Sequence, residues 1–299
     1  MDILISGAGG LIGAALQPAL RARGHHVRRL VRRSPPSDSR DIFWSPPGQK
    51  PPPESLEGVE AIIHLSGASI AAGRWTTARQ RAILESRVQT TEIIASVVSQ
   101  MAKPPSVFIG ASAIGYYGNR GTEWLDETSA SGVGFLAAVC RQWETAADPI
   151  EKRGVRVVHL RTGIVLSRQG GALKSMLLPF KLGLGGRLGD GKQYMSWISL
   201  EDLVRSIVFA VETPAVSGPV NGVAPEPVTN AEFTRTLGRL LHRPILFPVP
   251  AAALRLALGE RADALLLASL RLRPVRLLEN GFTFRQPTLE SALREILGK

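Results

Sequence analysis

Cysteine is nearly absent from this sequence: Cys140 is the only one among its 299 residues. A single cysteine excludes an internal disulfide and a cysteine-based metal cluster. No histidines, cysteines and carboxylates are grouped at the spacing of a metal site, so we expect no bound metal. A chain without disulfides suits a reducing compartment, and we therefore expect a cytoplasmic protein.

Long apolar runs are missing as well. The most apolar stretch, residues 251–272, is interrupted by Arg255, Glu260, Arg261 and Asp263, which excludes a helix that spans a bilayer. Residue 2 is acidic, and the first apolar run is too short for a signal peptide. We therefore expect no membrane partner.

Lysine is scarce, although the net charge is +11: only seven of the 36 basic residues are lysine, and the arginines are scattered along the chain. Scattered arginine indicates solvated faces and not a track of phosphate contacts. No zinc finger, aromatic RNA-binding motif or basic helix accompanies the charge, so we expect no nucleic acid. The expected partner is a small-molecule substrate, and the sequence leaves a homodimer open.

What the chain does have is a nucleotide-binding pattern in its first sixteen residues, MDILISGAGGLIGAAL. A short apolar strand runs into a glycine-rich turn of the form G-x-x-G-x-x-G and then into a helix. Glycines there permit the sharp exit from the strand, the approach of backbone amides to a pyrophosphate, and close packing of the helix on the sheet. The anion would lie at the positive end of the helix dipole. The residues of this expected cofactor turn are Gly7, Gly10, Leu11, Ile12 and Gly13.

An ordinary strand-turn-helix of any doubly wound fold is the alternative interpretation of this turn. The strand begins at residue 2, which favours the cofactor interpretation because dinucleotide-binding folds place this turn after their first strand.

The end of the second strand selects the cofactor. Residues 26–31 form that strand, and Arg32 and Arg33 follow it about twenty residues beyond the last glycine of the turn. An acidic residue there would bind a free ribose 2′-hydroxyl, whereas arginine pairs with a 2′-phosphate. No Asp or Glu occurs from position 3 to 37, which favours NADP(H) over NAD(H). The alternative is a pair of exposed arginines in an arginine-rich protein.

Further apolar runs predict strands at residues 61–65, 107–112 and 155–160, and helical patterns fill residues 73–100 and 136–152. Alternation of strands and helices is typical of a parallel sheet covered by helices on both faces. Directly after the strand at 61–65, small residues let the backbone pass along the adenosine of a nucleotide. These residues are Ser66 and Gly67.

The second half of the chain changes composition. The density of glycine in residues 170–191 predicts a loop folded over a pocket, with a plain surface connection as the alternative. Beyond it, the sequence predicts a short strand at 195–199 that leads into a helix, and a capped helix that starts near 228–232. Two leucine-rich helices meet at Gly259, and a final helix covers residues 288–297.

Several stretches together resemble the epimerase-type family of atypical, extended short-chain dehydrogenases/reductases. They are GAGGLIG, LSGAS, SRVQTTE, SAIGYYG, the WE at 143–144, LRTGIVL, MLLPF, WISLEDL and PVNGVAPEPVTNAEF. The chain most resembles the subgroup that ends in its own C-terminal domain of unknown function. The resemblance covers nearly the whole chain.

The resemblance implies an α/β fold with two parts. Residues 1–168 would form an NADP-binding Rossmann domain with a doubly wound parallel sheet, to which later segments return, and residues 169–299 a smaller C-terminal α/β substrate domain. The positions that match cofactor contacts of the family are Leu65, Ser66, Arg87 and Val165.

The resemblance fails at the usual acid-base pair. Extended members use Tyr-x-x-x-Lys, in which the lysine lowers the tyrosine pKa so that a phenolate can exchange a proton with the substrate. Counting back from Glu144, the lysine place holds Cys140 and the tyrosine place holds Leu136. None of the three tyrosines has a lysine four residues later. Cys140 is expected to fill the core of a helix and not to act as a nucleophile.

The sequence therefore predicts an NADP(H)-binding, epimerase- or oxidoreductase-like protein that acts on a small carbonyl or nucleotide-sugar-like substrate by an altered proton transfer. A sensor that binds NADP(H) without catalysis is the alternative. Tyr117 is the nearest candidate acid or base because it follows the fifth strand, and Ser112 could hydrogen-bond a substrate oxygen. The alternative for Tyr116 and Tyr117 is that they pack the cleft.

Overall fold

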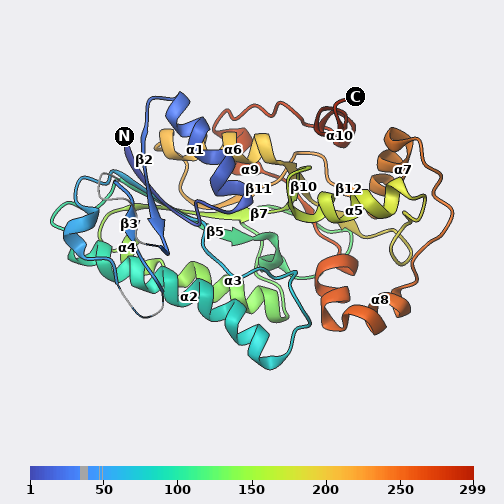
Figure 1. The fold of residues 1–299 in the computed structure, drawn as a ribbon, viewed down its shortest axis with the longest axis horizontal. Coiled ribbons are helices and arrows are strands. Elements are labelled where there is room, and N and C mark those ends of the chain that lie inside the picture. Colours follow the sequence, from blue (N-terminus) through green and yellow to red (C-terminus); the bar gives the residue numbers. More distant parts are fainter. Residues whose placement is uncertain (34–39, 47, 49) are drawn as a thin grey trace.

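A parallel sheet lies at the centre of the computed structural model, which describes residues 1–33, 40–46, 48 and 50–299 (Figure 1). Among these residues seven strands lie in the order β11-β7-β5-β4-β1-β2-β3, and each neighbouring pair is parallel. The strands are β1 (Asp2–Ser6), β2 (His26–Val31), β3 (Ile42–Phe43), β4 (Ala61–His64), β5 (Val107–Ala113), β7 (Arg156–Thr162) and β11 (Gly218–Gly222). This arrangement confirms the predicted α/β fold with a doubly wound parallel sheet.

Helices cover both faces of the sheet because both faces are apolar. Along β1, the side chains of Ile3 and Ile5 join the core on one face, and Leu4 joins the core on the other. The first face is covered by α1 (Leu11–Ala22) and α6 (Leu200–Glu212), and the second by α2 (Thr77–Gln100), α3 (Phe135–Thr145) and α4 (Asp148–Glu151) (Figure 1). Burial on two sides explains why the strands appear in the sequence as continuous apolar runs.

The order of the strands fixes where a ligand can bind. β1 lies between β2 and β4, so the chain leaves the centre of the sheet in opposite directions. In open parallel sheets, ligands bind outside the carboxyl ends of the strands at this switch point. The turn after β1 and the residues that follow β2, β4 and β5 lie at that edge, because these strands are parallel neighbours.

Residues after β7 build a smaller part with a core of its own, which includes Trp197, Phe233 and Leu237. Thr229 and Glu232 form a capping box at the start of its helix α7. The remaining helices are α5 (Gly171–Lys181), α7 (Asn230–Leu241), α8 (Ala251–Leu258), α9 (Val275–Glu279) and α10 (Leu289–Leu297). Short strands are β6 (Trp124–Leu125), β8 (Ile164–Leu166), β9 (Tyr194–Met195), β10 (Trp197–Ser199), β12 (Val228–Thr229) and β13 (Arg271–Leu272). None of the helices in the described ranges is long and apolar enough to cross a membrane.

The prediction of a loop over residues 170–191 is wrong for its first half. Helix α5 occupies Gly171–Lys181, and Leu173 and Phe180 are buried beneath it. Leucine, methionine and lysine are good helix formers, and these buried side chains attach the helix to the core of the smaller part. Only the glycine-rich residues after α5 form a connection without a helix.

Two helix boundaries also differ from those expected. The long helix expected at 73–100 begins only at Thr77, because Thr76 caps it by accepting a hydrogen bond from the Arg79 backbone N–H at 3.2 Å. The helix expected at 136–152 is interrupted between α3 and α4. Pro149 lies in the first turn of α4, where its missing N–H is tolerated, whereas a continuous helix would lose a hydrogen bond there.

Segments after residue 168 complete the large sheet. Strand β11 pairs with β7, and helix α6 packs against α1. Leu203, Ile207 and Val220 from these two elements are fully buried in the same core as Ile3 and Ile5. The predicted domain boundary at residue 168 therefore does not separate two cores, because residues before and after it pack together in one core.

A fragment of residues 1–170 is expected to lose cooperative unfolding. Burying one such side chain stabilises a fold by about 1.5–3 kcal/mol, so the loss of several approaches the roughly 5–15 kcal/mol that holds a domain together. Urea unfolding followed by circular dichroism measures this. A fragment of residues 1–222, which keeps α6 and β11, is the comparison and should resist more urea. Cooperative unfolding of the 1–170 fragment at the urea midpoint of the full chain would contradict the shared core.

Candidate functional site

The glycine-rich turn after β1 is too tight for side chains. Gly7 has a φ of +72°, and a Cβ there would lie 2.8 Å from the carbonyl carbon of Leu65. A Cβ on Gly13 would lie 2.4 Å from the carbonyl oxygen of Gly7. The backbone N–H of Gly10 donates to that same oxygen at 3.0 Å. The turn after β1 is therefore pressed against the residues that follow β4, and the first turn of α1 is pressed against the turn itself.

The start of α1 presents free backbone amides. Gly10 is the N-cap and supplies no side-chain cap, and no acidic residue occupies the first turn. The side-chain amide of Gln17 donates to the carbonyls of Ala8 at 3.0 Å and Gly13 at 3.2 Å. These two hydrogen bonds tie the turn to α1. The N–H groups of Leu11 and Ile12 precede the first helical hydrogen bonds. Because this helix start has no side-chain cap and is the positive end of the helix dipole, it is suited to bind a pyrophosphate.

Arg87 and Ser86 of α2 hold the segment that follows β4. The Arg87 guanidinium donates to the carbonyls of Ala68 and Ile83, each at 3.0 Å, and lies 5.0 Å from the centre of the Trp143 ring. The backbone N–H of Ala68 donates to the Ser86 hydroxyl at 3.0 Å. Burial lowers the pKa of Arg87. Arg87 therefore holds the segment that is predicted to border the adenosine, through its hydrogen bond to the Ala68 carbonyl.

A Cβ on Gly67 would come within 3.1 Å of the Arg87 guanidinium carbon, so a larger residue there would displace the guanidinium slightly. On the other side of the turn, a Cβ on Gly171 would lie 3.2 Å from the carbonyl oxygen of Val165 and 3.6 Å from Leu11. The structure therefore places Val165 near the start of α1, and Leu65, Ser66 and Gly67 against the turn and Arg87.

The arginines around β2 divide into two pairs. Arg28 donates to the Asp2 carboxylate at 2.8 Å, and Arg29 forms an ion pair with Asp41. Arg32 and Arg33 are exposed, and neither forms a hydrogen bond or an ion pair with another residue in the described ranges. The two arginines at the carboxyl end of β2 are therefore available to a ligand.

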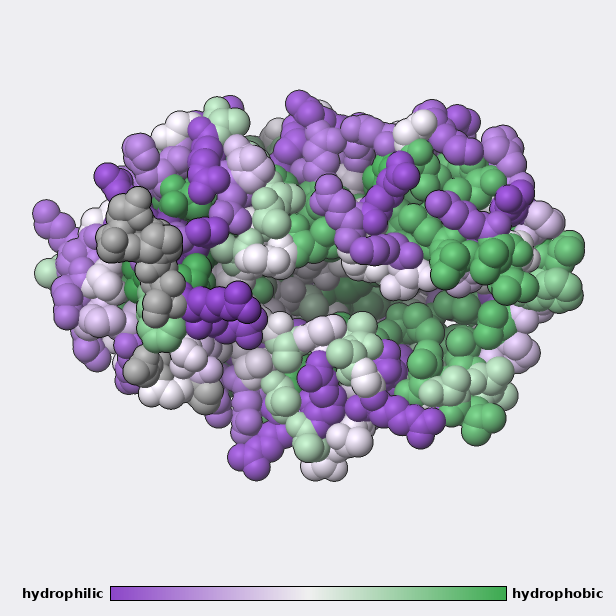
Figure 2. Space-filling model, viewed as in Figure 1, coloured by the Kyte–Doolittle hydropathy of each residue, from purple (hydrophilic) through white to green (hydrophobic). Residues whose placement is uncertain are grey.

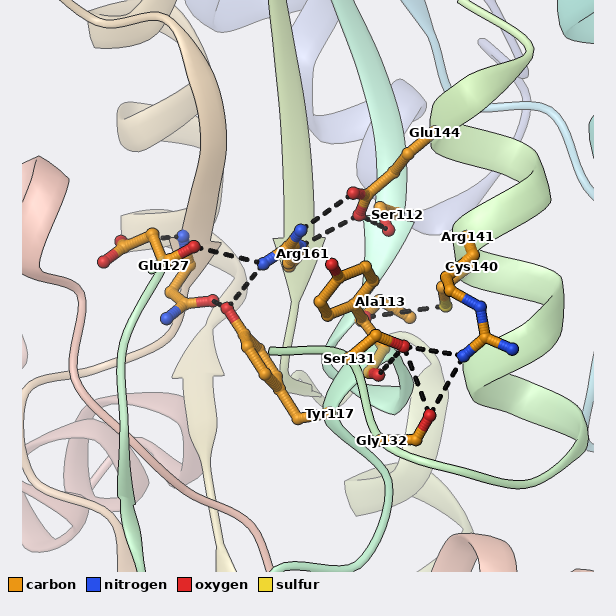
Figure 3. Close-up of polar contacts among 12 residues, drawn as sticks. Ser112, Ala113, Tyr117, Glu127, Ser131, Gly132, Cys140, Arg141, Glu144 and Arg161 are labelled. Carbon is orange, nitrogen blue, oxygen red and sulfur yellow. Dashed lines mark hydrogen bonds and ion pairs between the residues drawn. The ribbon is translucent and has the colours of Figure 1, made fainter. Parts of the chain in front are cut away.

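A buried ion pair lies near the carboxyl ends of β5 and β7 (Figure 3). Arg161 of β7 is 3% exposed, and its guanidinium donates to both oxygens of the Glu144 carboxylate, at 2.9 and 2.8 Å. The Ser112 hydroxyl donates to Glu144 at 2.7 Å. The Arg161 guanidinium carbon lies 3.4 Å from the centre of the Tyr116 ring. Burial alone would lower the pKa of Arg161, but its contacts with Glu144 and Tyr117 raise it, so it is a fixed cation.

Tyr117 is fully buried, and its hydroxyl already has two partners. It donates to the Asn221 side-chain oxygen at 2.8 Å and accepts from Arg161 at 2.9 Å (Figure 3). Asn221 is anchored in turn, because its backbone N–H donates to Glu127 at 3.0 Å and its side-chain N–H₂ to the Arg273 carbonyl at 3.0 Å. Burial raises the pKa of Tyr117 to about 12. These contacts favour the packing interpretation of Tyr117.

The positions of the missing tyrosine and lysine contain no acid or base. Leu136 packs against Gly115, and the Cys140 thiol lies 3.6 Å from the Ala113 carbonyl oxygen. Burial raises the pKa of Cys140 to about 11, so the thiol stays protonated at neutral pH. Burial also lowers the pKa of His64 to about 3, so it is a neutral residue packed in its strand, where it contacts the Ser6 and Thr90 hydroxyls.

No cluster of three or more potential metal ligands occurs in the part of the chain that the structure describes. The sequence did not reveal the buried network as a unit. One signal was available: Arg161 stands inside an otherwise apolar strand, where an unpaired charge would be costly. Glu144 served only to locate the places of the missing lysine and tyrosine, and its pairing with Arg161 was not predicted.

Two family models match the sequence. The one described as "NAD dependent epimerase/dehydratase family" matches residues 3–222, and a "Domain of unknown function (DUF1731)" matches residues 249–296. The first model therefore includes the large sheet through β11 and the candidate site, and the second begins near α8.

Curated relatives match along nearly their full length. Epimerase family protein Mb2239 of Mycobacterium bovis is 46% identical over 291 residues, which are 97% of this chain and 96% of that protein. Human epimerase family protein SDR39U1 is 36% identical over 300 residues, which cover 99% and 100% of the two chains.

Solved structures resemble the whole fold. The crystal structure of human epimerase family protein SDR39U1 (isoform 2) with NADPH has a TM-score of 0.88 and 33% sequence identity, with each chain covered completely. A nucleoside-diphosphate sugar epimerase from Corynebacterium glutamicum has a TM-score of 0.82 and 36% identity, and covers 100% of this chain and 58% of its own.

Proposed function

This chain belongs to the NAD dependent epimerase/dehydratase family, and we propose that it is a cytoplasmic protein that binds NADP(H) in preference to NAD(H). It acts on a small carbonyl or nucleotide-sugar-like compound without the tyrosine–lysine proton relay. The observation that carries the cofactor preference is the pair of exposed arginines, Arg32 and Arg33, at the carboxyl end of β2, which form no hydrogen bond or ion pair with another described residue. A similar human protein has been crystallised with NADPH, which supports the same choice.

The residues present fit a dinucleotide. The start of α1 would bind a pyrophosphate through its uncapped N–H groups, and Gly7 and Gly13 permit the tight turn that leads into the helix. Arg32 and Arg33 would hold the 2′-phosphate, and the segment from Leu65 to Gly67 would border the adenosine. Bound NADP(H) supplies reversible hydride transfer to or from a carbon of the substrate.

We assign the contact with a substrate oxygen to Ser112, which is 4% exposed and lies near the carboxyl end of β5. Its hydrogen is donated to Glu144, so towards a ligand it presents lone pairs and accepts a hydrogen bond. Arg161 holds Glu144 in place through two hydrogen bonds. Ser112 would therefore orient a substrate hydroxyl, and the proton would come from the substrate or from water.

The second candidate function is an NADP(H) sensor without catalysis. It is favoured by the absence of an acid or base that titrates near neutral pH at the tyrosine and lysine places, where Leu136 and Cys140 stand. A panel of carbonyl compounds and nucleotide sugars, followed by NADPH fluorescence, separates the two functions. Mass spectrometry and NMR of the compounds after incubation are read beside the fluorescence, because an epimerase returns its hydride and consumes no net NADPH. A sensor neither consumes NADPH nor changes the structure of any of these compounds.

Replacing Tyr117 by phenylalanine is expected to destabilise the fold and leave cofactor affinity unchanged. The Asn221 oxygen and one Arg161 N–H would lose a buried partner, which costs about 1–3 kcal/mol. Urea unfolding and NADPH titration measure the two effects. Tyr116→Phe is the matched control, because no hydrogen bond of the Tyr116 hydroxyl occurs in the described residues, and its effect should stay within about 0.5 kcal/mol.

If Tyr117 were the base, turnover would rise with pH towards the tyrosine pKa, and turnover of the folded Tyr117→Phe variant would be abolished. The packing role predicts the opposite pattern: lowered stability, with turnover of the folded variant unchanged.

Mass spectrometry of small molecules released by denaturing the purified protein tests the proposed function. We expect NADP⁺ or NADPH as the dinucleotide released. Recovery of NAD⁺ or NADH in its place would contradict the cofactor preference, and a bound carbonyl or sugar nucleotide would identify the substrate.

A further inference from the structure

Large apolar side chains are exposed at the end of the molecule formed by α5, α8 and the segments next to them (Figure 2). We call this surface the apolar patch. Its side chains are between 62% and 86% exposed. The patch consists of Leu178, Leu182, Leu184, Leu246, Phe247 and Leu256. The surfaces of soluble proteins rarely carry so many exposed large apolar side chains in one place, and patches of this kind mark interaction sites.

The two segments that carry the patch are joined by backbone contacts. The Val249 N–H donates to the Arg187 carbonyl at 2.8 Å, and the Gly189 N–H donates to the Val249 carbonyl at 2.9 Å. The Arg243 guanidinium donates to the Lys181 carbonyl at 2.7 Å. Helix α8 extends the surface, since Leu254 is its only buried residue. The patch is thus one built surface and not a set of separate loop tips.

The segments that carry the patch are rich in positive charge, and the nearest acidic residues, Asp190, Glu232 and Glu260, lie directly outside them. Residues 171–189 and 233–259 contain seven lysines and arginines and no aspartate or glutamate. All seven are exposed. They are Lys174, Lys181, Arg187, Arg235, Arg239, Arg243 and Arg255. Only Arg239 and Arg255 form ion pairs with carboxylates of the described residues, with Glu290 and Asp263. The other five form no ion pair with a carboxylate of the described residues, and Arg235 interacts electrostatically with Glu232.

We propose that the apolar patch docks on an anionic lipid bilayer. Exposed leucine and phenylalanine beside lysine and arginine is the composition of surfaces that lie in the membrane interface, and basic residues are drawn to acidic lipids. A second copy of the chain fits less well, because a symmetric dimer through the patch would bring these cations face to face. This proposal departs from the expectation of no membrane partner, which rested on the lack of a spanning helix and of a signal peptide. Neither feature is needed for attachment of this kind.

Co-sedimentation of the full-length protein with vesicles tests the proposal. Pure phosphatidylcholine vesicles are compared with vesicles in which about a third of the lipid is phosphatidylglycerol, at low and high salt. The protein is expected to bind the anionic vesicles at least about tenfold more tightly than the neutral ones, and to lose most of this binding at high salt.

Two double variants remove the two parts of the surface. Leu246→Ser with Phe247→Ser removes apolar contacts, and Lys174→Glu with Lys181→Glu reverses charge. Each is expected to weaken anionic vesicle binding at least about tenfold. Matched controls elsewhere on the surface are Leu278→Ser, at a leucine 47% exposed on α9, and Lys103→Glu with Lys152→Glu. These should bind as the unmodified protein does, and circular dichroism confirms that every variant is folded.

Failure of the unmodified protein to sediment with anionic vesicles would overturn the proposal, as would equal losses in the patch and control variants. Light scattering after size exclusion adds one more outcome. A dimer that dissociates in the Leu246→Ser, Phe247→Ser variant would show that a second copy, and not a bilayer, covers the patch.

Discussion

Replacing Glu144 by alanine is expected to lower the free energy of unfolding by about 3–5 kcal/mol, because it leaves a buried guanidinium without its counter-charge. Arg161 and Glu144 have side chains only 4% and 12% exposed, and two hydrogen bonds join them. No second carboxylate forms an ion pair with Arg161 in the described ranges. Urea unfolding measures the loss.

The surface pair Arg81 and Glu85 provides the control for this loss. It has the same charges and an (i, i+4) spacing on α2, but its side chains are 77% and 37% exposed. Glu85→Ala should therefore cost only about 0.3–0.5 kcal/mol. Replacing both buried partners, by Glu144→Leu with Arg161→Met, should restore part of the stability that Glu144→Ala loses. Equal effects of Glu144→Ala and Glu85→Ala would show that burial does not set the strength of the Arg161 pair.

Replacing Arg32 and Arg33 together by serine is expected to weaken NADPH binding tenfold to a hundredfold and to leave NADH binding nearly unchanged. A charge-assisted contact with the 2′-phosphate is worth about 1.5–3 kcal/mol, and NADH has no such phosphate. Fluorescence titration of each cofactor measures the two dissociation constants. Arg21→Ser, at an exposed arginine at the end of α1, controls for the loss of one of the two positive charges.

If the Arg32→Ser, Arg33→Ser variant lost affinity for both cofactors equally, these arginines would act through the general field of the protein and not through the 2′-phosphate. An equal loss in Arg21→Ser would lead to the same conclusion.

The sequence could predict the central strands and the glycine turn because their signals are local. Strands buried on both faces, such as β1, β4 and β5, appear as continuous apolar runs. The tight contacts of Gly7 and Gly13 follow from the spacing of the glycines around one turn. The exposed arginines Arg32 and Arg33 at the end of the second strand can also be read from the local sequence, and their contact with a 2′-phosphate stays a prediction.

Other features depended on contacts that the sequence does not contain. Helix α5 was missed because the glycines around it outweighed its own residues, and its stability comes from Leu173 and Phe180 packed in a distant core. The Arg161 network was missed because the residues that form it come from different strands and helices. Glu144 and Arg161 meet only through the packing of α3 beside β7, and Tyr117 meets Asn221 across 104 residues of sequence.

The central claim is that this fold binds NADP(H) in preference to NAD(H). Its most direct test is the titration of the unmodified, ligand-free protein with NADPH and with NADH, by fluorescence and at one salt concentration. We predict that NADPH binds roughly tenfold to a hundredfold more tightly, as expected for a contact of about 1.5–3 kcal/mol with the 2′-phosphate. Equal affinities, or tighter binding of NADH, would contradict it.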